Sequence, residues 1–275
     1  MILSVKNRDN LKNQSMHSPR LNFLLNTLPD ADYERLVPNL ELVGLSAGTE
    51  IFHTGQQRTG IYFPTTCTVS AQIELQNGAC TDIYLLGQHG LFGTGTPQRG
   101  TFFKAVVRKP GFAYLCPIDI FMEELMRAEG VMMMSLLATR IMMEEMAKNI
   151  SCRTFHTVIQ QVTRWLINYG QGDPIETITI THSDLADALG VRREAVTLAL
   201  NQVEQQGCVS LNRGHIKVKD YQLLKNLACD CNSEPTLNKI WGDQELSNIK
   251  DLPSKLKSIN SLSLIKTKSF DNGST

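Results

Sequence analysis

The first half of the chain alternates short runs of β-branched and aromatic residues with glycines between Leu42 and Pro117. Runs of this kind, separated by turn-forming residues, are typical of β-strands. The predicted strands cover residues 48–52, 60–63, 69–75, 82–85, 105–107 and 112–115. Asn77-Gly78 lies between two of them, and this dipeptide favours the tight turn of a hairpin. Many short strands at regular spacing predict a β-sandwich or β-barrel.

A long apolar pattern, dense in methionine, follows at residues 118–150 and predicts one continuous helix. One stripe at heptad spacing predicts a dimer interface formed by Met132, Leu136, Thr139, Met143, Met146 and Ile150. A second stripe of Met134, Leu137 and Ile141 is expected to contact the strand-rich half. A helix buried within one chain is the alternative, but apolar residues on two faces favour the dimer. Methionine side chains repack readily, so such a helix could shift when a signal arrives.

The segment 180–200 predicts two short helices joined at a glycine. Thr181 or Ser183 can cap the first helix with a side-chain oxygen, and Gly190 permits the left-handed backbone that a sharp turn needs. The apolar residues at helical spacing are Leu185, Ala186 and Leu189 in the first helix and Val191, Val196 and Leu200 in the second. Arg192, Arg193 and Thr197 then point outward. This arrangement is a helix-turn-helix.

Two flanking elements complete a larger domain. Residues 155–169 predict a helix whose apolar side packs against the helix-turn-helix. Residues 208–211 and 215–219 alternate as two strands around a turn at 212–214, which predicts a wing. The outward face of the second helix of the helix-turn-helix would then enter a DNA major groove. A ligand-binding or protein-interaction module, whose winged helix docks on protein, is the alternative.

At these positions the chain resembles the Crp/Fnr family of bacterial transcription regulators. The matching residues are Leu185, Ala186, Gly190, Arg193, Glu194, Val196 and Gly207. A branch of that family with the turn Gly-Val-Arg-Arg and a Cys-x-Cys pair after the wing is the most similar, since Cys229 and Cys231 stand there. The resemblance spans roughly residues 21 to 231.

The resemblance implies an α+β protein with three parts: an N-terminal β-roll like that of cyclic-nucleotide-binding domains, a long dimerisation helix, and a C-terminal winged helix-turn-helix. It implies a homodimer that binds double-stranded DNA at a pseudo-palindromic operator, with RNA polymerase as a further candidate partner. The expected divisions are a flexible N-terminus at 1–20, the sensor roll at 21–117, the dimerisation helix at 118–151, the DNA-binding domain at 152–225 and a mobile tail at 226–275.

The predicted DNA contacts follow from the same match. Arg193 is expected to bond a guanine with both arms of its guanidinium, and Glu194 to accept from a cytosine amino group. Arg192 would meet a base or a phosphate. The full predicted set is Arg192, Arg193, Glu194, Thr197, Thr181, Arg213, His215 and Lys217. The family usually has a further arginine where this chain has Leu198, so the operator is expected to differ.

The groups that hold a cyclic nucleotide in relatives are absent. Thr94 stands where a glutamate would meet the ribose, and Phe103-Lys104-Ala105 where an arginine pair would meet the phosphate. Lys104 or Arg99 could meet an anion, but an ammonium does not replace a planar, bidentate guanidinium. The sequence therefore predicts no cyclic-nucleotide cofactor.

The seven cysteines are scattered, and residues 1–66 contain none, which speaks against an N-terminal iron–sulfur ligand set. Cys67, Cys80, Cys116 and Cys208 are interpreted as small buried residues of the strands. Cys229 and Cys231 could share a metal or take part in redox chemistry, but two ligands do not make a zinc site. The histidines His53, His89, His156, His182 and His215 are interpreted as lacking metal-ligand spacing.

Charge and composition narrow the function less than the motifs do. The formal net charge of the chain is 0, so a DNA footprint must come from the arrangement of charges. No constellation of catalytic residues has a convincing spacing, and the chain is not expected to be an enzyme. The cysteine usage, and the absence of a signal peptide or a bilayer-spanning apolar run, predict a cytoplasmic location.

Overall fold

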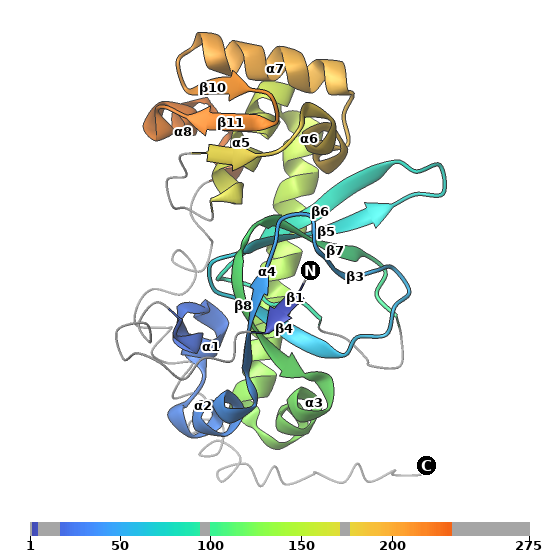
Figure 1. Ribbon diagram of the computed structural model, residues 1–275, viewed down its shortest axis with the longest axis vertical. Coiled ribbons are helices and arrows are strands. Elements are labelled where there is room, and N and C mark those ends of the chain that lie inside the picture. Colours follow the sequence, from blue (N-terminus) through green and yellow to red (C-terminus); the bar gives the residue numbers. More distant parts are fainter. Residues whose placement is uncertain (1, 5–16, 94–99, 171–176, 233–275) are drawn as a thin grey trace, which may run out of the picture.

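The computed structural model describes residues 2–4, 17–93, 100–170 and 177–232. A strand-rich N-terminal part and a mainly helical C-terminal part are connected by the long helix α4, Glu129–Phe155 (Figure 1). Thr94 and Arg99, the loop at 171–174 and the tail beyond 232 lie outside the described residues. Among the described residues, no helix is both long and apolar enough to cross a bilayer.

The N-terminal part is a roll of two four-stranded antiparallel sheets. One sheet has the order β1 (Ile2–Ser4), β2 (Glu41–Leu45), β8 (Gly111–Pro117) and β4 (Gly60–Pro64). The other has the order β3 (Glu50–Phe52), β7 (Lys104–Lys109), β5 (Thr68–Glu74) and β6 (Cys80–Leu86). All six predicted strands are present, whereas β1 and β2 were not predicted. Residues 2–4 belong to the segment expected to be flexible, and they pair with β2.

The hairpin predicted at Asn77-Gly78 connects β5 and β6. Gly78 has a positive φ of 80°, a conformation that glycine adopts without steric cost. The backbone N–H of Leu75 donates to the carbonyl of Ala79 at 2.8 Å and closes the turn.

Short helices cover one end of the roll: η1 (Pro19–Leu21), α1 (Phe23–Thr27), α2 (Asp30–Leu36) and η2 (Val37–Asn39). Asn22 ties them to the strands. Its side-chain oxygen caps α1, and its buried amide donates to the carbonyls of Pro64 at 2.8 Å and Gly90 at 2.9 Å.

The prediction of one continuous helix over 118–150 is wrong. The chain forms α3 (Ile118–Arg127), an extended residue at Ala128, and then α4. The break coincides with a tertiary contact, because the backbone N–H of Gly130 donates to Asp32 at 3.1 Å. A Cβ at Gly130 would lie 2.2 Å from that carboxylate, so α2 packs directly on the first turn of α4. A contact with a residue about a hundred positions away leaves no local sequence signal.

The inner face of α4 lies on the roll as predicted. Met134, Leu137 and Ile141 are buried and belong to the same core cluster as the strands. Apolar burial of this kind is what fixes the long helix to the sensor part.

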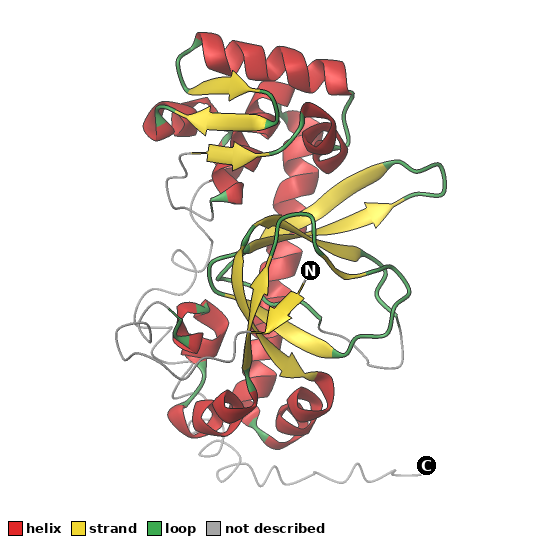
Figure 2. Cartoon of the chain, viewed as in Figure 1, coloured by secondary structure: helices red, strands yellow, loops and turns green. Residues whose placement is uncertain are grey.

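The C-terminal part combines helices with a small sheet (Figure 2). Its helices are α5 (Val158–Tyr169), α6 (His182–Leu189), α7 (Arg193–Gln205), α8 (Tyr221–Leu227) and η3 (Asp230–Asn232). Its sheet has the order β10 (Val209–Asn212), β11 (His215–Val218) and β9 (Thr177–Thr179). The helix expected from 155 begins only at Val158, because Thr157 forms a capping box with Gln160 and Phe155 still belongs to α4.

Candidate nucleic-acid interface

The turn between α6 and α7 has the predicted geometry. Thr181 caps α6: its hydroxyl accepts from the N–H of Asp184, whose side chain completes a capping box. Gly190 has φ 68° and ψ 33°, and its N–H donates to the carbonyls of Ala186 and Asp187. This left-handed residue ends α6 and turns the chain into α7.

Helix α7 has one buried face and one open face. Its buried residues Val196, Ala199, Leu200 and Val203 lie in the domain core. Arg192, Arg193 and Glu194 are exposed at its start, and Leu198 is 65% exposed one turn later. No salt bridge joins Arg192 or Arg193 to an acidic group within the part of the chain that the structure describes. The two guanidiniums are therefore open to an external anion or base.

Three of the predicted contact residues also have structural partners, and one of them is His215, whose Nδ1 lies 3.2 Å from the hydroxyl of Thr179. The hydroxyl of Thr181 donates to Asp184 at 2.6 Å within the capping box. The hydroxyl of Thr197 donates to the carbonyl of Arg193 at 3.0 Å and lies 3.0 Å from Nδ1 of His182. The contact between Thr197 and His182 connects α7 to the start of α6, whereas the bonds of Thr181 cap α6.

The wing is a regular antiparallel hairpin next to α7. Ser210 pairs with Lys217 and Asn212 with His215 across the β10–β11 ladder. Ile216 points into the core, whereas His215 and Lys217 alternate with it and are exposed. Arg213 is exposed in the turn, so the predicted wing residues share an open surface. Figure 1 shows α7 along the outer end of the molecule, with the wing beside it.

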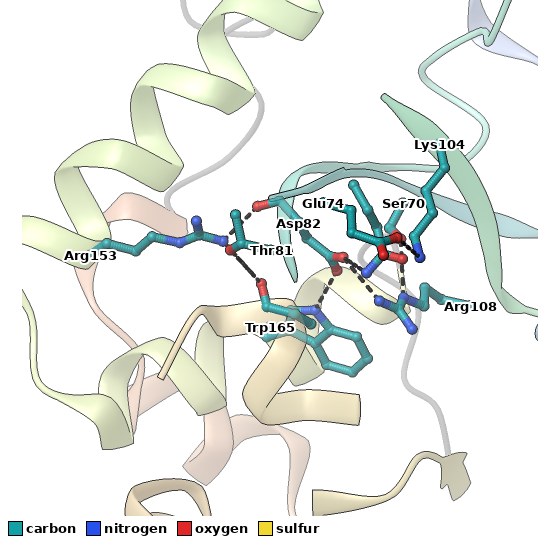
Figure 3. Close-up of polar contacts among 10 residues, drawn as sticks. Ser70, Glu74, Thr81, Asp82, Lys104, Arg108, Arg153 and Trp165 are labelled. Atoms are coloured by element: carbon teal, nitrogen blue, oxygen red, sulfur yellow. Dashed lines mark hydrogen bonds and ion pairs between the residues drawn. The ribbon is translucent and has the colours of Figure 1, made fainter. Parts of the chain in front are cut away.

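A buried polar network joins the inner side of this domain to the roll (Figure 3). Asp82 of β6, 3% exposed, accepts from Gln72 at 2.7 Å, from Arg108 at 2.9 Å and from the indole N–H of Trp165 at 3.3 Å. Arg108 and Gln72 belong to the roll, whereas Trp165 belongs to α5 of the winged domain. One buried carboxylate therefore connects the two parts of the molecule.

A second set of bonds reaches the helix-turn-helix itself. Arg153 of α4 donates from one nitrogen to the carbonyl of Asp82 at 2.5 Å and to that of Ala188 at 3.0 Å. The hydroxyl of Thr81 also donates to the carbonyl of Ala188, at 3.3 Å. Ala188 lies in the last turn of α6, where carbonyl groups lack intrahelical partners and a cation is favoured. Burial lowers the pKa of Arg153, and the nearby Asp82 acts in the opposite direction.

The sequence interpretation did not find this junction. It treated Asp82 as part of a strand and Trp165 as part of an apolar helix side. A carboxylate at the start of an otherwise apolar strand segment was the available signal, but its partners are up to 83 residues away.

The interior of the roll is filled by aromatic side chains. Phe52, Tyr62, Tyr84, Phe92 and Phe103 are buried there, with neighbouring ring centroids 5.8 to 6.4 Å apart. Lys104, a candidate for binding an anion, instead lies 3.1 Å from the carboxylate of Glu74 (Figure 3).

The outer face of α4 is apolar and open. Met132, Leu136, Thr139, Met143 and Ile150 of the predicted dimer stripe are exposed. Met146, the remaining member, is half-buried and packs against the core of the roll. Five of the six predicted residues thus share an uncovered face of the helix.

Candidate metal ligands also come together, although the sequence interpretation had set one of them aside. Sγ of Cys152, Cys229 and Cys231 and a ring nitrogen of His156 all lie within 4.8 Å of one another. The prediction that His156 lacks metal-ligand spacing is wrong, because His156 directly follows the last turn of α4 and its ring lies beside the thiols of Cys152, Cys229 and Cys231. As predicted, Cys67, Cys116 and Cys208 are buried, whereas Cys80, predicted to be buried too, is only half-buried.

Comparisons with known proteins agree with this architecture. Residues 160–227 match the family model of the Crp-like helix-turn-helix domain. A search of curated protein sequences gave no significant match.

Solved structures of regulators have the same fold. FixK2 from Bradyrhizobium japonicum is 16% identical, with a TM-score of 0.58 over 69% of this chain and 98% of that one. A transcriptional regulator of the CRP/FNR family from Thermus thermophilus is 20% identical, with a TM-score of 0.53 over 68% and 98% of the chains. The c-di-GMP responsive global regulator CLP from Xanthomonas campestris is 12% identical, with a TM-score of 0.56 over 70% and 99% of the chains.

The fold therefore defines a sensor roll joined by a long helix to a winged helix-turn-helix. Residues 160–227 form a Crp-like helix-turn-helix domain, as the sequence motif predicted, and the described part of the chain has the fold of solved CRP/FNR-family structures.

Proposed function

We propose that this regulator binds double-stranded DNA as a homodimer, with the start of α7 in the major groove. The observation that carries the proposal is the open face at that helix start, where Arg192, Arg193 and Glu194 are exposed beside the wing. Guanidinium groups in this position can reach guanine edges, while Arg213 and Lys217 of the wing meet phosphates. Transcription is then controlled by occupancy of an operator.

The apolar outer face of α4 supports the homodimer. Leu136, Met143 and Ile150 are 56%, 61% and 67% exposed, and they follow one another at heptad-like spacing. A stripe of large exposed apolar side chains on a monomer is typical of an interface. Two copies joined along α4 would present two α7 helices to the two halves of a symmetric site.

The aromatic filling of the roll supports a signal other than a cyclic nucleotide. The ring cluster occupies the space between the sheets, and Lys104 is already paired with Glu74. Millimolar cyclic AMP or cyclic GMP should therefore leave the melting temperature unchanged, since a ligand of the native state would raise it by mass action. A concentration-dependent rise would overturn this part of the proposal.

Selection of bound sequences from a random duplex library tests the DNA proposal. The expected result is a motif with two-fold symmetry, bound with an affinity that falls steeply with salt. Arg127→Ala is the control for loss of one positive charge. Arg127 belongs to α3, at the opposite end of the molecule from α7 (Figure 1), so this variant should select the same motif as the wild type. Failure to enrich any sequence, with no salt-dependent binding, would favour the protein-docking alternative.

The dimer has its own test. Leu136→Lys combined with Met143→Lys should convert the protein to a monomer in light scattering, because each charge would face a symmetry mate. Met126→Lys is the matched control, since Met126 is 80% exposed on α3 and outside the stripe. A dimer that survives the double substitution would show that this face is not the interface.

A further inference from the structure

Four potential ligands from distant parts of the sequence meet beside the winged domain. Cys152 lies in the last turn of α4 and His156 is the residue that follows this helix, whereas Cys229 precedes η3 and Cys231 lies within it. Sγ of Cys152 lies 3.6 Å from Sγ of Cys229, and Sγ of Cys231 lies 3.5 Å from Nδ1 of His156. The sulfur–sulfur distance excludes a Cys152–Cys229 disulfide, whose sulfur atoms would be about 2.05 Å apart, and all three cysteines are free to bind an ion.

The spacing fits one tetrahedral ion. With zinc–sulfur bonds of about 2.3 Å, neighbouring ligand atoms of a tetrahedron lie roughly 3.8 Å apart, and zinc–nitrogen bonds shorten that edge slightly. The observed separations are close to this value, and all four ligand atoms lie within 4.8 Å of one another. A multi-iron cluster would hold its ligands on different metal atoms and hence farther apart.

The histidine is oriented for metal binding. Its Nδ1 faces the sulfur of Cys231, while its Nε2 lies 3.6 Å from the carboxylate of Asp230. A small movement of the exposed Asp230 side chain would bring the two groups into a hydrogen bond. Histidines that bind metals usually donate their second ring N–H to such a group, which fixes the tautomer and the ring orientation.

The surroundings suit a negatively charged thiolate set. Three thiolates around a divalent cation leave one negative charge, and the buried guanidinium of Arg164 lies beside Cys152. Nε of Arg164 is buried without a hydrogen-bond partner among the described residues.

We propose that Cys152, His156, Cys229 and Cys231 bind one zinc ion in a closed structural site. Four protein ligands leave no open position for substrate, which distinguishes a structural from a catalytic zinc site. Three thiolates and an imidazole are also the soft ligand set that selects zinc over magnesium or calcium.

The ion would cross-link the two ends of the winged domain. Cys152 and Cys229 are 77 residues apart, and the whole helix-turn-helix and wing lie between them. The site would fix the segment after α8 to the end of α4, the same helix that carries the predicted dimer face. Closing so long a loop should stabilise the domain, since the unfolded chain loses freedom while the native fold is unchanged. The proposal does not depend on DNA binding.

Metal analysis of the full chain, purified without chelators and under reducing conditions, tests the proposal. The expected result is one zinc ion per chain by mass spectrometry, and a lower melting temperature after removal of the ion by a chelator. Cys229→Ser with Cys231→Ser should lose the ion. Cys80→Ser is the matched control and should retain it, because Cys80 lies on β6 outside the cluster.

Cobalt substitution keeps the test independent of whether the double variant folds. The wild-type chain with Co²⁺ should show the visible bands of a tetrahedral site and thiolate charge-transfer absorption, and added zinc should displace both. A chain without zinc and without these bands would overturn the proposal, as would full zinc occupancy in the double variant. The zinc proposal would also be overturned by iron and sulfide in the purified chain, which would indicate an iron–sulfur cluster, or by a Cys152–Cys229 disulfide in the metal-free chain.

Discussion

The winged domain has charged groups at its outer surface and at its junction with the roll and α4, but the charges are exposed at the first and buried at the second. On the outer face, Arg192 and Arg193 are exposed and have no salt-bridge partner among the described residues. On the inner face, both carboxylate oxygens of the buried Asp82 accept hydrogen bonds, and Arg153 donates to two carbonyls. The difference separates exposed charges that are available to a partner from buried charges that hold two parts of the molecule together. Unpaired cations at a surface remain available to phosphates and bases, whereas satisfied buried groups define one arrangement of two domains.

The inner face also explains how the roll could act on the helix-turn-helix. Thr81 contacts the last turn of α6, and a Cβ on Gly190 would lie 3.1 Å from the Thr81 hydroxyl. A displacement of β6 would therefore also displace the turn at Gly190, which sets the direction of α7. Coupling of this kind needs a second arrangement of the same groups, which substitutions at Asp82 should favour.

The largest effect is expected at the inner face. Asp82→Ala should lower the free energy of unfolding by about 3–5 kcal/mol, because it leaves the guanidinium of Arg108 and the indole N–H of Trp165 buried without their acceptor. Urea denaturation followed by circular dichroism measures the loss. The base preference on DNA should be unchanged in the folded fraction.

The control for this prediction is Asp187→Ala, which removes an exposed carboxylate of α6. Its effect should stay within about 0.5 kcal/mol. In an Arg108→Met background the Asp82→Ala substitution should cost less, since the uncompensated charge is gone. If both alanine substitutions lowered the free energy of unfolding equally, the junction at Asp82 would make no specific contribution to stability.

The sequence predicted those features whose causes are local. Gly190, Gly78 and the wing turn could be recognised because turn geometry restricts the residue type at one position. The strands of the roll and the buried stripe of α4 could be recognised because period-2 and helical patterns record which side is buried. The exposed arginines of α7 follow from the same periodicity.

The missing features depend on residues that are far apart in the sequence. The break at Ala128 coincides with the contact of Gly130 with Asp32, and the Asp82 network joins β6 with α4 and α5. The sequence indicated half of the cysteine–histidine cluster, since Cys229 and Cys231 are separated by one residue. Cys152 and His156 join them only through the packing of η3 on the end of α4. Local patterns cannot supply such pairings.

A smaller effect is expected at the outer face. Arg193→Ala should weaken operator binding by about 1–3 kcal/mol per half-site and relax the preference at one symmetric base position, because a bidentate guanine contact is lost. The free energy of unfolding of this variant should hardly change, since the Arg193 side chain is exposed. Binding titrations against the selected operator and its single-base variants give both quantities. Wild-type preference in the Arg193 variant would mean that α7 does not read the groove, and protein docking would become the better interpretation.

The smallest effect is expected in the wing, and it distinguishes the two kinds of contact on the outer face itself. Lys217 is exposed and alternates along β11 with the buried Ile216, so its ammonium group can reach a phosphate without reading a base. Lys217→Ala should weaken binding to all sequences alike and reduce the slope of log affinity against log salt by about 1, because one fewer counterion is released. Titrations of operator and random duplex at several salt concentrations measure both changes. If Lys217→Ala instead altered the base preference and left the salt slope intact, the wing would be reading sequence, and the roles assigned to α7 and the wing would have to be exchanged.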